Sequence, residues 1–510
     1  MDSVFITAGF AALAIVYGVY RRYSHISLAD VPGPESASFI MGNLKELYQG
    51  QAADADFKWQ AQYGNIVRFK GSFGEDQLMI SDPAALQYIF AKSAYRFPKP
   101  PDRRVLSQLI NGKGLSGRRV GDDHKRHRRI MLPGFGGPES KAFLLFKNCA
   151  ESMSNKWTET INNSKEGSVV FNIPVWLSRA TLDAIGEAAF DVRFSSIDDN
   201  ESALRAHTGY ECQTDVFGSP SDGEVLFQGI SKYIPRRILE YFVGRAKTHV
   251  SCACVRGNLA TSVAKQDDIG GQGSRDVFSL LVKANMDADA KAKLTEEELF
   301  AQMRTILLAG HETTSNTIWE TEAAVHARGD VNFTIADFDA MPYTTAVMKE
   351  VLRFCPVISC NTDAPAKMTS FRCHSQSPRS GHVIRELPVP KGTRIVASIA
   401  AYNRNKELWG EDAHVFNPDR WLNGTAKEKK VTSIGVYSNL MTFGGGERSC
   451  IGWRFAVIEI QAFLTEIVGK FEFAPTDKTE LIGGKLACEV ENGVQLPLRV
   501  SLAPRTGKGC

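Results

Sequence analysis

The stretch of sequence that decides the fold is FGGGERSCIG, which runs from Phe443 to Gly452. Its three successive glycines let the backbone turn sharply and come close to a flat cofactor, where larger side chains would collide. The pattern after Cys450 is that of a helix, and a cysteine at a helix N-terminus gains from the helix dipole and from free N–H groups, which favour the thiolate. A free cysteine is more often a small buried residue, but this setting favours an anionic metal ligand.

A long helix is predicted upstream of the cysteine stretch, beginning at Thr295. Thr295 and Glu298 have the spacing of a capping box, and Leu294 and Leu299 that of a hydrophobic staple. Within this helix the stretch 309–314 reads AGHETT and interrupts the apolar pattern. Small residues let a helix pass close to a cofactor, and threonine hydroxyls can bond to backbone carbonyls and distort the helix. A polar kink or a solvated helix face is the alternative interpretation.

Composition and charge exclude some classes of protein. The chain has 510 residues, of which 43% are hydrophobic, so it can bury an extensive core. Its 60 Lys and Arg nearly balance 57 Asp and Glu, and a net charge of +3 does not indicate nucleic acid as a partner. The ten cysteines show no regular spacing, which is typical of reduced thiols rather than a disulfide framework.

The N-terminus has the features of a membrane anchor. The 18 residues from Ser3 to Tyr20 carry no charge and are followed at once by Arg21 and Arg22. As a helix this run would be about 27 Å long, close to the thickness of a bilayer core. Cleaved signal peptides usually carry positive charge before the apolar run, and here only Asp2 precedes it. We therefore predict an anchor helix over residues 1–22, with the rest of the chain in the cytosol.

The remaining chain is predicted to form one domain. Residues 23–36 contain Pro-Gly-Pro and are interpreted as a hinge, and residues 37–510 show no internal repeat. Long helical patterns dominate, so the expected fold is mainly α with small peripheral β-sheets. Short strand-like runs are found at 64–69, 77–80, 393–399 and 494–502.

The cysteine stretch resembles the haem-binding motif FxxGxRxCxG of the cytochrome P-450 family at every fixed position, namely Phe443, Gly446, Arg448, Cys450 and Gly452. The resemblance covers nearly the whole chain and is strongest to microsomal members from fungi, with a basidiomycete character. It implies the cytochrome P-450 fold and haem b (iron protoporphyrin IX) with Cys450 as its axial thiolate. It also implies that Phe443 packs beside the sulfur and that Arg448 pairs with a haem propionate.

The resemblance assigns roles to four further residues around the haem. The stretch 309–314 matches the family's oxygen-activation motif (A/G)GxETT, so Thr313 would hydrogen-bond dioxygen at the haem and Glu312 would relay protons. His124 and Arg128 match a WxxxR motif that contacts the propionates, with histidine in the tryptophan position. Both side chains can donate a hydrogen bond to a carboxylate. The neighbouring cations could instead face an acidic redox partner.

Three more residues match a structural network of the family. Glu350 and Arg353 lie at i and i+3 on a predicted helix, a spacing that allows an ion pair but is common and means little alone. They match the family's ExxR motif, and Arg420 matches the third member. The implied role is to hold the segment that carries the cysteine stretch.

The function implied is that of a monooxygenase on the endoplasmic reticulum membrane. It would use O₂ to oxidise a lipophilic small molecule, such as a terpenoid, in fungal secondary metabolism or in xenobiotic oxidation. We find no FAD, FMN or NADPH module in the sequence, so electrons would come from a separate NADPH-cytochrome reductase.

Two segments depart from the family pattern. Thr313 and Glu350 are only 37 residues apart, and residues 319–322 join two pieces that are normally separated. Residues 360–379 lack the expected apolar strand and an arginine for the second propionate, and a reading-frame error in the gene is one hypothesis for this segment. Two alternatives therefore stay open: a haem-thiolate isomerase or dehydratase, and a non-catalytic haem binder.

Overall fold

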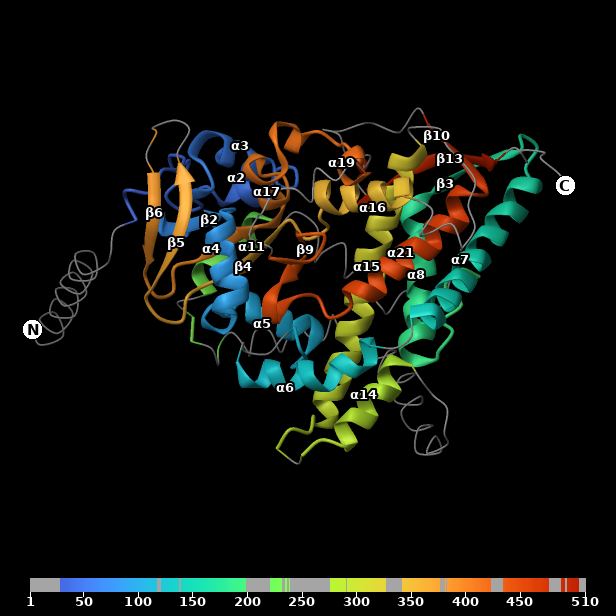
Figure 1. The fold of residues 1–510 in the computed structure, drawn as a ribbon, viewed down its shortest axis with the longest axis horizontal. Helices are drawn as coiled ribbons and strands as arrows, with labels where there is room; N and C mark the ends of the chain where they lie inside the picture. The colour runs from blue at the N-terminus through green and yellow to red at the C-terminus, as the bar shows by residue number, and fades with distance from the viewer. Residues whose placement is uncertain are drawn as a thin grey trace, which may run out of the picture.

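The computed structural model describes a mainly helical protein with small sheets on opposite sides of the molecule (Figure 1). The residues that it describes are 28–116, 121–136, 139–198, 221–231, 234–235, 238, 276–289, 291–326, 342–376, 381, 383–422, 434–476, 488–490 and 493–503. The predicted fold class is confirmed for these residues.

The helices surround a long central one, α15. The helices of the described chain are α2 (Leu44–Tyr48), α3 (Asp54–Tyr63), α4 (Pro83–Gln87), α5 (Pro101–Asn111), α6 (Asp122–Met131), α7 (Glu139–Asn162), α8 (Ile173–Phe190), α11 (Asp222–Ser231), α14 (Val277–Met286), α15 (Glu296–His326), α16 (Pro342–Phe354), α17 (Ile399–Asn403), α18 (Lys406–Trp409), α19 (Asp419–Leu422) and α21 (Trp453–Val468). The short helical turns η2 (Tyr88–Lys92) and η8 (Gly446–Arg448) contact each other at the cysteine stretch, and η1 (Ser72–Gly74) lies beside α11.

The strands form small sheets. The largest has the order β1-β2-β7-β4, with β1 (Ile66–Lys70), β2 (Asp76–Ile80), β7 (Ile395–Ser398) and β4 (Cys360–Asp363). A second has the order β10-β13-β3, with β10 (Phe471–Pro475), β13 (Pro497–Leu502) and β3 (Ser168–Asn172). The strand pairs are β5 (Thr369–Gln376) with β6 (Val383–Val389), β8 (Gly435–Tyr437) with β9 (Leu440–Gly445), and β11 (Cys488–Val490) with β12 (Gly493–Gln495). The four predicted strand regions are confirmed.

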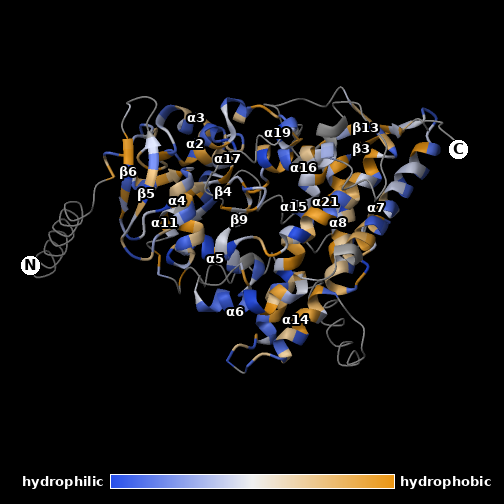
Figure 2. Ribbon diagram, viewed as in Figure 1, coloured by the Kyte–Doolittle hydropathy of each residue, from blue (hydrophilic) through white to orange (hydrophobic). Residues whose placement is uncertain are grey.

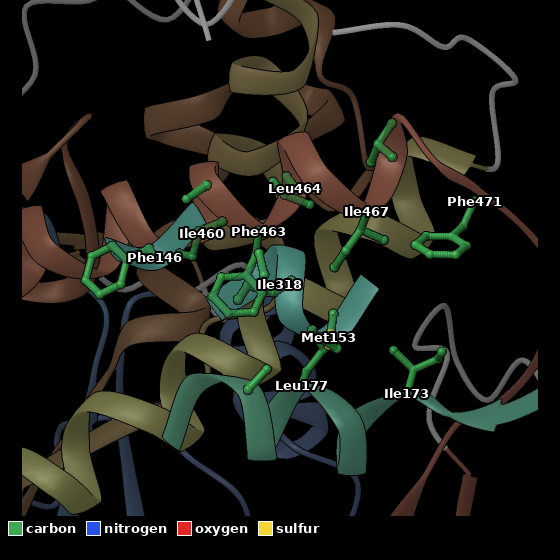
Figure 3. Close-up of a cluster of buried hydrophobic side chains, with 14 of the residues drawn as sticks. Phe146, Met153, Ile173, Leu177, Ile318, Ile460, Phe463, Leu464, Ile467 and Phe471 are labelled. Carbon is green, nitrogen blue, oxygen red and sulfur yellow. The ribbon is translucent and has the colours of Figure 1, made fainter. Parts of the chain in front are cut away.

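The main hydrophobic core lies where α7, α8, α15 and α21 meet. Figure 3 shows Phe463 and Ile460 of α21 facing Met153, Leu177 and Ile318 from the other three helices. Phe463, Leu177 and Ile318 are fully buried. Burying one such side chain contributes about 1.5–3 kcal/mol, so this core fixes α21 against α15. In contrast to these core helices, α6 consists largely of hydrophilic residues (Figure 2).

The start of α15 has the predicted capping box. The Thr295 N–H donates to Glu298 Oε2 at 2.9 Å, and the Glu298 N–H donates to Thr295 Oγ1 at 3.3 Å. Further along, Gly310 lies against α8, where an added Cβ would be 2.7 Å from Ile185 Cδ1. The small size of Gly310 therefore serves the packing of α15 on α8, a role that the sequence pattern did not indicate.

The two irregular segments form regular structure where they are described. The sequence of 360–379 lacks the apolar strand of the family pattern, yet strands form in this stretch. Residues 360–363 are β4, which pairs antiparallel with β7, and residues 369–376 are β5. Backbone pairing does not require apolar side chains. The backbone of residues 319–322 continues α15 without a break, whereas residues 327–341 and 377–379 lie outside the described residues.

The predicted anchor, residues 1–22, lies outside the described residues, as does the start of the hinge. The described part of the hinge packs on β1, because Arg68 N–H donates to the Pro32 carbonyl at 2.9 Å. A Cβ on Gly33 would be 1.6 Å from the Arg68 carbonyl oxygen, so glycine is required there. Among the helices of the described chain, none combines the length and apolar character that crossing a bilayer demands.

Candidate active site

The cysteine stretch forms a tight loop between β9 and α21. Gly444 and Gly446 have φ angles of +68° and +61°, which favour glycine. A Cβ on Gly446 would be 2.2 Å from the Phe90 carbonyl oxygen, so η8 approaches the backbone of η2 closely. The Cys450 N–H donates to the Phe443 carbonyl at 2.8 Å and closes the loop. The glycines thus allow the sharp turn. Gly446 in addition allows a close approach to the backbone of η2, and not only to a cofactor.

Cys450 is the exposed free thiol of the described residues. Burial raises the pKa of this thiol, whereas the Gly452 N–H and the charge of Arg128 lower it. The sulfur is thus accessible and yet largely surrounded by protein. In such a place the positive charge of a metal ion would favour the thiolate.

Arg128 and His124 reach the cysteine loop from α6. Arg128 Nη1 donates to the Ser449 carbonyl at 2.7 Å, and Nη2 contacts Ser449 Oγ at 3.1 Å. His124 Nδ1 lies 3.2 Å from the Tyr95 hydroxyl. Burial lowers the pKa of His124 to about 4, with a further contribution from nearby cations. The imidazole is therefore neutral at pH 7 and can still donate one hydrogen bond.

Three cations, Lys99, Arg128 and Arg448, surround the neutral His124, and we call these four residues the cation cluster. Arg128, Arg448 and Lys99 all act electrostatically on His124. Burial lowers the pKa of Lys99, Asp363 raises it, and Arg448 lowers it further. The sequence analysis missed Lys99. A signal was present, because prolines on both sides of it, Pro98 and Pro100, stiffen the chain there.

The residues of the site fit a haem. An iron porphyrin needs one axial ligand and partners for two carboxylates, and Cys450 and the cation cluster supply these chemical types. Arg448 Nε is buried and has no hydrogen-bond partner within the described parts of the chain. A buried N–H without a partner costs free energy, so this donor is suited to an acceptor that the protein itself does not provide.

Glu350, Arg353 and Arg420 form one buried network behind this loop. Arg353 Nε and Nη2 donate to the two Glu350 oxygens at 2.9 and 2.7 Å, and Arg420 Nε donates to Glu350 at 3.1 Å. Trp421 Nε1 also donates to Glu350, at 2.9 Å. Asn403 fixes the segment before the cysteine loop, because the Met441 N–H donates to its Oδ1 at 2.9 Å.

Glu312 and Thr313 lie in the middle of α15. Burial raises the pKa of Glu312 to about 7, and its Oε2 is buried without a hydrogen-bond partner in the described structure. Thr313 Oγ1 donates to the Ala309 carbonyl at 2.7 Å, which leaves the lone pairs of the hydroxyl free to accept. At neutral pH this segment can therefore both hold and release a proton.

A second acid, Glu459 of α21, is fully buried against α15. Burial raises its pKa well above 4.5, although the neighbouring Thr314 hydroxyl lowers it somewhat. Neither carboxyl oxygen has a hydrogen-bond partner among the residues described. The group is therefore protonated in the folded protein at pH values where it is ionised in the unfolded chain.

This difference predicts a pH-dependent effect of Glu459→Gln. The folded chain binds the proton more tightly, so Glu459 costs stability as pH rises above about 4.5, with a slope of up to about 1.4 kcal/mol per pH unit. Glutamine does not titrate. We expect the melting temperature of the variant, relative to that of the wild type, to increase between pH 5 and pH 8. A difference that stays constant with pH would contradict the raised pKa.

Comparison with known proteins agrees with this geometry. The family model described as Cytochrome P450 matches residues 32–485. Cytochrome P450 monooxygenase 205 from Postia placenta is 30% identical, and the match covers 98% of each chain. Cytochrome P450 monooxygenase claU from Ampulloclitocybe clavipes is 27% identical over 98% of this chain and 96% of its own. Because the family model spans most of its length, the chain belongs to the cytochrome P450 family of haem-thiolate monooxygenases.

Proposed function

We propose that the chain binds haem b through Cys450 and inserts one oxygen atom of O₂ into a lipophilic small molecule. The accessible thiol of Cys450 beside the cation cluster is the observation that carries this proposal. Haem with a thiolate ligand supplies the activation of O₂, because the thiolate donates electron density to the iron. Arg448, His124, Arg128 and Lys99 would hold the propionates.

Glu312 and Thr313 would control proton delivery in this reaction. A carboxyl group with a pKa near 7 gives up and regains a proton at neutral pH with little cost. Thr313, whose hydrogen is donated to the Ala309 carbonyl, would accept a hydrogen bond from a proton-bearing group. This pair favours oxygenation over a haem-thiolate isomerase or dehydratase, which needs no protons for O₂.

Electrons would come from an NADPH-dependent reductase that docks near α6. Lys125 and Arg129 are exposed on this helix and are available to an acidic partner. Arg126 serves a different role, because its Nη2 donates to Glu298 at 2.7 Å and so ties α6 to α15. The basic residues of α6 thus have two roles: Arg126 makes a contact within the protein, and Lys125 and Arg129 face the solvent.

Exposed apolar side chains near the start of the described chain support a membrane location. Phe39 and Ile40 are 72% and 52% exposed, and the rings of Phe39 and Phe73 lie 6.4 Å apart. Phe227 of α11 is also exposed, and α11 approaches this region because Gly229 packs on Ser72. Together with the apolar N-terminal stretch, this supports a single-pass protein of the endoplasmic reticulum. Extraction of the full-length protein from microsomes by alkaline carbonate would contradict it.

The proposal is tested in two steps with the full-length protein. A reduced carbon monoxide difference spectrum should show the band of thiolate-ligated haem, and a shifted or absent band would favour a non-catalytic haem binder. With an added NADPH-cytochrome reductase, candidate terpenoids, steroids, fatty acids and polycyclic aromatics should then stimulate NADPH and O₂ consumption. Fungal secondary metabolism and xenobiotic oxidation are the two expected settings. A product formed without O₂ would favour the isomerase or dehydratase instead.

Glu312→Gln should separate proton delivery from electron supply. We expect product formation to fall by about 100-fold, with a smaller effect on NADPH consumption and an unchanged carbon monoxide spectrum. The pH dependence of the wild-type rate near pH 7 should also disappear, because glutamine does not titrate. Glu472→Gln, which changes an exposed acid of β10, is the matched control. An unchanged ratio of product to NADPH would remove Glu312 from the mechanism.

A further inference from the structure

The carboxylate of Asp363 occupies an unexpected place at the end of β4. The family pattern has an arginine for the second propionate in this segment, and this sequence lacks it. The structure instead places Asp363 against Arg448, whose Nη1 and Nη2 each donate to one of its two oxygens at 3.0 Å. The side chains of Asp363 and Arg448 are only 4% and 12% exposed. This is a bidentate, charge-assisted pair, the strong form of such a contact.

Pairing of β4 with β7 fixes Asp363 in this position. Asp363 is opposite Ile395 in the antiparallel register, and the next residue, Ala364, donates its N–H to the Pro98 carbonyl at 3.0 Å. That contact brings the end of β4 beside Lys99. Backbone hydrogen bonds thus hold Asp363 next to two members of the cation cluster, in addition to its side-chain pair with Arg448.

Asp363 is a buried carboxylate that acts on the cluster. It raises the pKa of Lys99, whereas Arg448 lowers it. Glu447, which acts electrostatically on Tyr95, is exposed and more strongly screened by water. The third nitrogen of the Arg448 guanidinium, Nε, is buried without a partner in the part of the chain described. Of the five N–H groups of the guanidinium, two donate to Asp363 and the one on Nε has no partner there.

We propose that Asp363 is an internal counter-ion that competes with a haem propionate for Arg448. Before haem binds, it compensates buried positive charge that would otherwise be left without a counter-ion. After haem binds, the propionate and Asp363 are two like charges around one guanidinium. Asp363 therefore stabilises the haem-free chain more than the haem-loaded one and weakens haem binding. It also places a negative charge near the haem, which disfavours addition of an electron.

The test compares Asp363→Asn with the wild type, both as full-length haem-loaded proteins. Asparagine keeps the size of the side chain and removes its charge. We expect haem transfer to excess apomyoglobin to slow by about tenfold and the reduction potential of the haem to rise. These two measurements need no substrate. A wild type that takes up no haem would count against haem binding itself, which is a different failure.

Two control variants make the result specific. Asp363→Glu keeps the charge and should match the wild type in reduction potential. Glu298→Gln removes the charge from another arginine pair, that of Glu298 with Arg126, and should leave the potential unchanged. Faster haem loss or an unchanged potential in Asp363→Asn overturns the proposal, because Asp363 would then only stabilise the local structure. Failure to recover Asp363→Asn even when it is expressed with excess haem overturns it as well.

Discussion

The Cys450→Ser variant is expected to fold and to lose monooxygenase activity by more than about 100-fold, since loss of even an indirect partner of a metal ligand typically costs 10- to 100-fold. Serine is close in size to cysteine, so the loop from Phe443 to Gly452 should persist through the Cys450 N–H bond to the Phe443 carbonyl. The hydroxyl cannot supply the electron density that a thiolate donates to haem iron. The reduced carbon monoxide difference spectrum should therefore lose the band of thiolate ligation.

Cys373→Ser is the matched control for this experiment. Cys373 is buried on β5, its Sγ contacts the Ile384 carbonyl at 3.5 Å, and burial raises its pKa to about 12. Such a thiol is inert as a ligand. The control should keep both the spectrum and the activity. A Cys450→Ser protein that retained the thiolate band would show that another cysteine holds the iron.

Features set by local sequence were predictable. The capping box of Thr295 and Glu298 and the pairing of Glu350 with Arg353 each join residues three apart, and both are present. Strands such as 77–80 follow from a short apolar run. The cysteine loop was predictable because its backbone conformation requires glycine at particular positions, and these glycines can be identified in the sequence.

Features set by distant contacts were not predictable in the same way. Asp363 and Arg448 are 85 residues apart, and they meet only because β4 pairs with β7 in one register. Lys99 joins the cation cluster through the contact of Ala364 with Pro98. Gly310 faces Ile185 only because α8 packs on α15. In each case tertiary packing determines which residue is the partner. The local periodicity of the sequence carries no information about that packing.

Arg353→Ala is expected to cause the largest loss of stability. Arg353 is fully buried, and besides Glu350 it donates to the carbonyls of Asn403, Ala413 and Val415 at 2.9, 2.7 and 3.1 Å. Removing one partner of a buried ion pair costs about 3–5 kcal/mol, because the other charge stays buried. The carbonyls of Asn403 and Ala413 would also lose this donor, whereas that of Val415 would keep Arg420 Nη2 at 3.4 Å. We expect a lower urea midpoint of unfolding and little haem in the purified protein.

Arg353→Lys should recover only a small part of this loss. Lysine has three donors on one nitrogen, whereas Arg353 uses a planar fork to reach Glu350 on one side and the carbonyls of residues 403–415 on the other. Arg499→Ala is the matched control, since Arg499 pairs with Glu166 at the surface and such pairs contribute about 0–1 kcal/mol. If Arg353→Ala lost no more stability than this control, the network would not be what holds the cysteine loop in place.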